Sequence, residues 1–123
     1  MTLNEYQQQA MTTCLPEAEN FSYMMLNLVG EVGEFAGKVA KAIRNGQVKM
    51  KPNGNPCPAI SAKMEDVIDY NDALKKEAGD ILWQLSGLCS VMGWRLEDIA
   101  QQNLDKLADR KSRQVIDGSG DDR

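Results

Sequence analysis

LVGEVGEF, residues 28–35, sets the helical character of this chain, and EAGD, residues 77–80, repeats its design. Each stretch holds two carboxylates three residues apart, within a run of apolar residues spaced as on a helix. Side chains at i and i+3 are neighbours on a helix, so Glu31 meets Glu34 and Glu77 meets Asp80. These like charges repel each other. A hard cation such as Mg²⁺, which prefers oxygen ligands, would remove the repulsion.

The two acidic pairs occupy equivalent positions on their helices. At about 100° per residue, each helix has one continuous apolar face. These faces contain Phe21, Met24, Leu28, Val32, Phe35 and Val39 in the first helix, and Leu74, Ala78, Ile81, Leu85, Leu88 and Met92 in the second. The first acid of each pair lies at the edge of that face, and the second lies about 60° beyond it. If the helices pack antiparallel, four carboxylates meet along one seam. Solvated surface acids are the alternative, because such pairs are common on exposed helices.

Three motifs of this sequence resemble those of the MazG-type all-α nucleoside triphosphate pyrophosphohydrolases. They are LVGEVGEF at 28–35, KKEAGDILW at 75–83 and NLDKLADR at 103–110, with LNEYQ at 3–7 as an earlier point of similarity. The resemblance covers most of the chain except residues 46–68 and the tail. The family often shows Glu-Glu-x-x-Glu in the first motif, and here Gly30 replaces the first Glu. That departure is typical of the compact single-domain branch, and it removes one candidate metal or water contact.

The resemblance implies a fold, an activity and a set of site residues. The fold would be an all-α, four-helix MazG-like bundle subunit of a homo-oligomer, a dimer or, more in keeping with compact members, a tetramer. The activity would be Mg²⁺-dependent hydrolysis of a (d)NTP to a (d)NMP and pyrophosphate, with Mn²⁺ as an alternative metal. Its role would be nucleotide-pool clearance. The implied metal ligands and catalytic residues are Glu31, Glu34, Glu77 and Asp80, and the implied substrate-binding residues are Lys38, Asn103, Lys106 and Arg110.

Composition excludes several other classes of protein. The chain has 123 residues, which suits one domain with a modest core. It has no histidine, so catalytic triads and Glu-x-x-His di-iron sites cannot be built. Its three cysteines, at 14, 57 and 89, lack metal-ligand spacing, and a reducing cytoplasm is their simplest location. The net charge of -4 argues against binding of a nucleic-acid polymer. Neither a membrane span nor a signal peptide is indicated.

Local signals predict four helices in one domain, residues 1–113. A capping box of Thr2 and Glu5 opens the first helix, which runs to about residue 12. The second runs from about 20 to 44, the third from 66 or 71 to 92, and the fourth from about 96 to 111. Residues 46–62 are rich in proline and glycine and predict an inserted loop. This loop is either a lid over the site or a disordered surface segment, and the second is the simpler interpretation. The polar tail, residues 114–123, is expected to fray.

Three side chains have both a structural and a functional interpretation. Lys38 lies four residues after Glu34, so it predicts either an ordinary ion pair along the helix or a phosphate contact. Asn103 shares a helix face with Leu96, Ile99, Ala100 and Leu107, which predicts a buried amide in need of partners. Trp83 points away from the apolar face of its helix, among Gly79, Ser86, Gly87 and Ser90, which predicts a second packed surface, most simply against another subunit.

Two functions outside catalysis also fit these residues. One is a helical interaction module that binds through the Trp83 surface, with its acids solvated. The other is a Mg²⁺- or Ca²⁺-binding protein without turnover. A rise in melting temperature with Mg²⁺ favours a metal site over the interaction module, since a ligand stabilises the state that binds it. Only product analysis separates the enzyme from the metal-binding protein.

Overall fold

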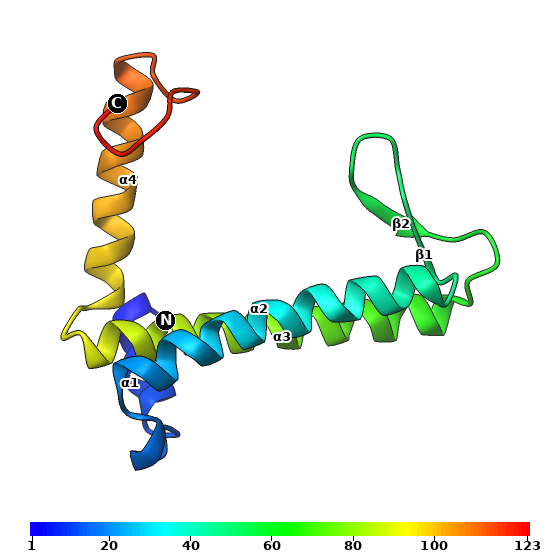
Figure 1. The fold of residues 1–123 in the computed structure, drawn as a ribbon, viewed down its shortest axis with the longest axis horizontal. Helices are drawn as coiled ribbons and strands as arrows, with labels where there is room; N and C mark the ends of the chain where they lie inside the picture. Colours follow the sequence, from blue (N-terminus) through cyan, green and yellow to red (C-terminus); the bar gives the residue numbers. More distant parts are fainter.

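The computed structural model describes residues 1–123 and is mainly helical, as the sequence predicts (Figure 1). Its elements are α1 (Leu3–Met11), η1 (Pro16–Ala18), α2 (Phe21–Arg44), β1 (Val48–Met50), β2 (Pro56–Pro58), α3 (Met64–Val91) and α4 (Leu96–Ser112). The helices α2 and α3 lie side by side and antiparallel over most of their length, α1 packs near one end of the pair, and α4 projects away from it (Figure 1).

The helix ends follow signals that the sequence carries locally. At the start of α1, Thr2 Oγ1 accepts from Glu5 N at 3.1 Å and Glu5 Oε2 accepts from Thr2 N at 2.7 Å, so the predicted capping box is confirmed. Asn20 Oδ1 caps α2 by accepting from Tyr23 N at 2.9 Å. Gly46 ends that helix with a φ of 71°, a conformation that glycine adopts without steric cost.

Residues 46–62, predicted as an inserted loop, contain a short β-hairpin. The strands β1 and β2 pair antiparallel, with Val48 opposite Pro58 and Met50 opposite Pro56. Proline lacks the N–H that an interior strand must donate, but a two-stranded hairpin has only edge strands, where proline is tolerated. Val48 is buried, so the hairpin is anchored to the helices. The prolines that predicted an irregular loop are therefore compatible with a strand in this particular setting.

Trp83 packs against α1 of its own chain, so the second packed surface predicted for this side of α3 is formed within the chain. Its indole N–H donates to Thr13 Oγ1 at 2.9 Å and to Ala10 O at 3.1 Å. The small residues nearby serve intrachain packing too. A Cβ on Gly87 would collide with Met24 Sδ, and Met24 is the fully buried side chain that α2 contributes there. Trp83 and Gly87 thus face α1 and α2 respectively.

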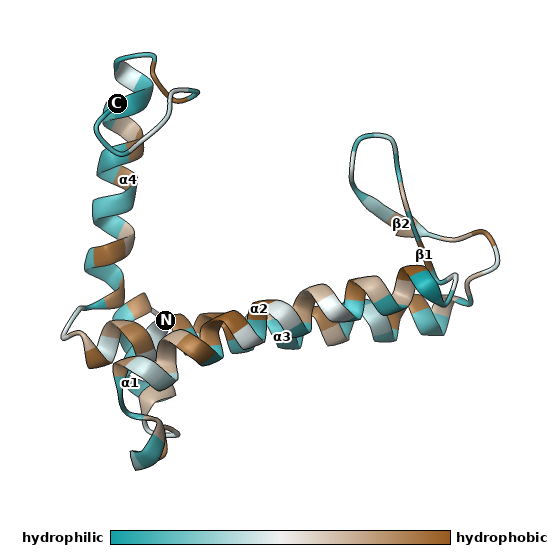
Figure 2. Ribbon diagram, viewed as in Figure 1, coloured by the Kyte–Doolittle hydropathy of each residue, from teal (hydrophilic) through white to brown (hydrophobic).

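The predicted apolar faces of α2 and α3 are only partly covered within one chain. Met24 is completely buried, but Phe21 remains 53% exposed and Val32 50% exposed. On α3, Leu85 and Met92 are also exposed. Figure 2 shows hydrophobic residues along both helices, whereas α4 is mainly hydrophilic. Since only 11 of 123 residues are buried, a single chain leaves much of its apolar surface in contact with water.

A side chain from α1 supplies the cap that α4 lacks. The N-cap residue of α4 is Arg95, and its side chain makes no capping hydrogen bond. Instead Gln7 Oε1 accepts from Leu96 N at 2.8 Å, while Gln7 Nε2 donates to Trp94 O at 2.9 Å and to Ser90 Oγ at 3.0 Å. One amide therefore ties α1 to the end of α3 and to the start of α4.

Replacing this amide should loosen α4 selectively. We expect Gln7→Ala to lower the free energy of unfolding by about 1–3 kcal/mol, because it leaves the Leu96 N–H without its partner in a part-buried setting. Urea unfolding measures the change, and hydrogen exchange at Leu96 should accelerate. Gln8→Ala is the matched control, because the side chain of Gln8 is exposed and makes no hydrogen bond. Equal effects of the two substitutions would contradict this role of Gln7.

Candidate functional site

Three carboxylates from the two acidic motifs meet between α2 and α3. Oxygen atoms of Glu31, Glu34 and Glu77 all lie within 4.8 Å of one another. Glu31 and Glu34 are one helical turn apart on α2, and the antiparallel packing brings α3 alongside so that Glu77 faces them. Glu34 is exposed, Glu31 is half-buried and Glu77 is buried, so the cluster opens to solvent on one side.

Glu77 carries an oxygen that the protein itself does not satisfy. Its Oε1 lies 3.3 Å from Lys38 Nζ, whereas its Oε2 is buried and accepts no hydrogen bond. A buried carboxylate oxygen without a partner is costly, and native proteins rarely leave one unsatisfied. A divalent cation among these all-oxygen ligands would satisfy it, so the donor set fits Mg²⁺.

Lys38 pairs across the helix interface and not along its own helix. The expected i,i+4 partner was Glu34, but the ammonium group lies by Glu77 on α3 instead. The lysine side chain is 41% exposed, so it reaches solvent beside the acidic cluster. It also lines, with Lys41, Asp66 and Asp69, a hollow of about 290 Å³. The structure thus leaves Lys38 accessible to an anionic ligand.

The side-chain amides of Asn27 and Gln84 orient Glu31, and neither was predicted from the sequence. Asn27 Nδ2 donates to Glu31 Oε1 at 3.2 Å and to Gln84 Oε1 at 2.7 Å. Gln84 is almost completely buried, and its Nε2 lies 3.4 Å from Met24 O. Asn27 lies four residues before Glu31, which is a spacing that the sequence could have indicated. The contribution of Gln84 depends on the pairing of α2 with α3.

The electrostatics of Glu31 reflect crowding of negative charge. Burial raises its pKa most, the charges of Glu34 and then Asp80 raise it further, and only the hydrogen bond from Asn27 lowers it. Burial and the neighbouring carboxylates therefore make ionisation of Glu31 less favourable than that of a free glutamate. A cation bound at the cluster would offset this repulsion.

Asp80 lies near the cluster but outside the group of three. It is exposed, yet its charge raises the pKa of Glu31, and it adds to the effect of burial in raising the pKa of Tyr6 on α1. The predicted meeting of four carboxylates is seen for three of them, with the fourth at the margin.

The residues of the third motif lie apart from the acids within one chain. Asn103, Lys106 and Arg110 are carried by α4, which projects away from the α2–α3 pair (Figure 1). Asn103 is exposed, so its expected place in the core is wrong. Leu107 on the same face is exposed as well. Arg110, in contrast, is buried by the tail.

The comparisons with known proteins identify the family of this chain and are consistent with its helical fold. The profile of the MazG nucleotide pyrophosphohydrolase domain matches residues 19–115, and this chain belongs to that family. The chain is also 36% identical over 107 residues to the Gene 37 protein of Mycobacterium phage L5, covering 85% of this chain and 78% of the phage protein. No solved structure matches the chain significantly. None of its helices combines the length and the apolar character that crossing a bilayer requires.

Proposed function

We propose that this protein is a Mg²⁺-dependent nucleoside triphosphate pyrophosphohydrolase that releases a nucleoside monophosphate and pyrophosphate, acting in nucleotide-pool clearance. The observation that carries the proposal is the buried, unpartnered Oε2 of Glu77 within a cluster of three carboxylates. Membership of the MazG family supports the same reaction class. Glu31, Glu34 and Glu77 would hold the metal, with Asp80 completing the set from the margin.

The reaction needs neutralised phosphate oxygens and an activated water. Bound Mg²⁺ would supply charge compensation for the phosphates and would lower the pKa of water. Glu31, held in orientation by the 3.2 Å hydrogen bond from Asn27, would accept the proton of the water that attacks the α phosphorus. Lys38, accessible beside Glu77, would bind a phosphate oxygen as a point charge.

The site would be completed by assembly of several chains. The helix α4, which carries these cations, projects away from the α2–α3 pair of its own chain (Figure 1), and α2 and α3 expose apolar residues that a second copy would cover. We therefore propose a homo-oligomer, at least a dimer and preferably a tetramer, in which Asn103, Lys106 and Arg110 of one chain bind the nucleotide held by another. Closed symmetric assembly is the usual way of burying such surfaces.

A metal-binding protein without turnover, or a helical interaction module, is the competing function. The exposed apolar residues of α2 favour some interaction surface, whether or not the protein is an enzyme. Mg²⁺ should raise the melting temperature if the acidic cluster binds it. A screen of canonical and modified (d)NTPs with pyrophosphate detection then identifies turnover and the preferred base and sugar.

The position of bond cleavage can be read from isotope incorporation. In ¹⁸O-labelled water, we expect the label in the nucleoside monophosphate and none in pyrophosphate, because the water attacks the α phosphorus. Mass spectrometry of both products measures this, with a reaction in unlabelled water as the control. Formation of a nucleoside diphosphate and orthophosphate would instead indicate a phosphatase.

A further inference from the structure

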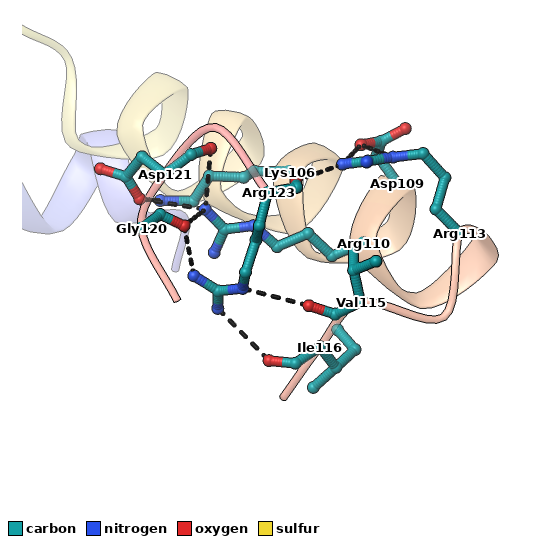
Figure 3. Close-up of polar contacts among 9 residues, drawn as sticks. All are labelled: Lys106, Asp109, Arg110, Arg113, Val115, Ile116, Gly120, Asp121 and Arg123. Carbon is teal, nitrogen blue, oxygen red and sulfur yellow. Dashed lines mark hydrogen bonds and ion pairs between the residues drawn. The ribbon is translucent and has the colours of Figure 1, made fainter. Parts of the chain in front are cut away.

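The C-terminal tail, residues 114–123, folds back on the last turns of α4 instead of fraying (Figure 3). Gln114, with a φ of 59°, reverses the chain, and Val115 N donates to Arg110 O at 2.9 Å. Arg123 then closes the turn by donating from Nε to Val115 O at 3.1 Å. The tail is thus held in a defined conformation by its own polar contacts.

Asp121 is the side chain that this tail brings to α4. Its Oδ1 accepts from Arg110 Nη2 at 3.0 Å and lies 3.4 Å from Lys106 Nζ (Figure 3). Arg110 also donates to the backbone oxygen of Asp121 at 3.2 Å. Hydrogen bonding by Arg110, and next by Lys106, lowers the pKa of Asp121, so the carboxylate stays ionised at neutral pH. Two cations one helical turn apart therefore converge on one anion.

The two sides of this contact differ in how firmly they are built into the fold. Arg110 is only 5% exposed, whereas the side chain of Asp121 is 85% exposed. A buried guanidinium requires a negative or carbonyl partner at all times. An exposed carboxylate on a tail is easily exchanged, because such ion pairs contribute little to stability. Asp121 is therefore a replaceable counter-ion, and its departure would uncover the guanidinium of Arg110 for another anion.

We propose that Lys106 and Arg110 form a phosphate-binding site, and that Asp121 closes this site when no ligand is present. The tail then acts as an intramolecular competitor of the nucleotide. This inference rests on the proposed function, in which both cations contact the substrate. Asn103, one turn earlier, lines with Lys106 a hollow of about 250 Å³, so polar groups continue along the helix from the closed site.

Phosphate chemistry favours displacement of the tail. A polyphosphate presents several charged oxygens to the fixed fork of Arg110 and to Lys106, whereas Asp121 presents one carboxylate. Because the ligand binds only when the tail is open, the apparent Kd equals the intrinsic Kd divided by the fraction of time for which the site is open. If the site is open about one tenth of the time, the apparent Kd is weakened about tenfold.

Metal-free titration with tripolyphosphate tests the inference directly. Calorimetry on the full chain should show Asp121→Asn binding about tenfold more tightly than the unaltered protein. Asp122→Asn makes the same charge change at a neighbouring acid that forms no ion pair or hydrogen bond, and its Kd should not change. Adding Lys106→Gln to Asp121→Asn should abolish the gain. Equal or weaker binding by Asp121→Asn, or no tripolyphosphate binding by any variant, would overturn the proposal.

Turnover measurements separate this inference from the proposed function. With Mg²⁺ and a (d)NTP, Asp121→Asn should lower KM several-fold and leave kcat unchanged, since the tail competes with substrate and takes no part in the chemistry. If no variant turns over any nucleotide but the tripolyphosphate affinities differ as expected, the enzyme assignment fails and the tail inference stands. If turnover occurs with equal KM and equal tripolyphosphate Kd in both proteins, the tail inference alone fails.

Discussion

Glu34→Gln should lower Mg²⁺-dependent turnover at saturating nucleotide by at least about 100-fold, the scale on which one charge-stabilising group acts in catalysis. The substitution removes a negative ligand from the group of Glu31, Glu34 and Glu77 but retains the shape of the side chain. Because Glu34 is exposed, the helical circular dichroism should be unaltered. A coupled pyrophosphate assay over a range of Mg²⁺ concentrations measures the loss.

Stability provides a second readout for the same substitution. Glu34 is the charge that most raises the pKa of Glu31, so its neutralisation should leave the metal-free unfolding midpoint level or slightly higher. The increase in melting temperature caused by Mg²⁺ should disappear. Glu65→Gln, an exposed acid at the start of α3, is the matched control and should change neither property. Near-normal turnover by Glu34→Gln would refute the metal assignment.

Val29→Glu should dissociate the proposed oligomer. Val29 is 68% exposed and, with Phe21, Met25 and Val32, forms a stripe along α2 at spacings of three and four residues. A glutamate placed in a self-associated face would bury an uncompensated charge, which costs about 3 kcal/mol, or about 100-fold in dissociation constant. Sedimentation velocity at micromolar concentration measures the assembly.

Activity should fall with assembly if α4 of one chain serves the acids of another. Ile60→Glu is the matched control, because Ile60 is fully exposed beside the hairpin, outside the α2 stripe, and this change should leave assembly intact. Trp83→Glu would not serve as a test of the interface, since it would detach α1 by removing the hydrogen bonds to Ala10 and Thr13. A fully active monomer would contradict the composite site.

Local sequence signals predicted the helices and the meeting of the acids with good accuracy. The Thr2 capping box and the stop at Gly46 depend on contacts within a few residues, which the sequence displays directly. The pairing of Glu31 and Glu34 follows from helical geometry alone. Their meeting with Glu77 needed only one further condition, that the two helices run antiparallel side by side.

The β-hairpin could not be predicted by the same reasoning. Pro56 and Pro58 are unsuitable in the interior of a sheet, and the sequence does not show that the sheet has only two strands. The strands are also short, and Val48 is anchored by burial against other elements. Strand pairing of this kind depends on tertiary context more than on residue preference.

Four helices and two acidic pairs in equivalent positions could be predicted because they depend on interactions between residues three or four apart. Which face of α3 meets which partner depends instead on contacts between residues far apart in the chain. A helical wheel shows that Trp83 and Leu85 lie on different faces, but it does not show that α1 covers the first and leaves the second exposed. The contact of Asp121 with Arg110 was likewise decided by a chain reversal at Gln114, a left-handed conformation that glutamine does not signal in the sequence.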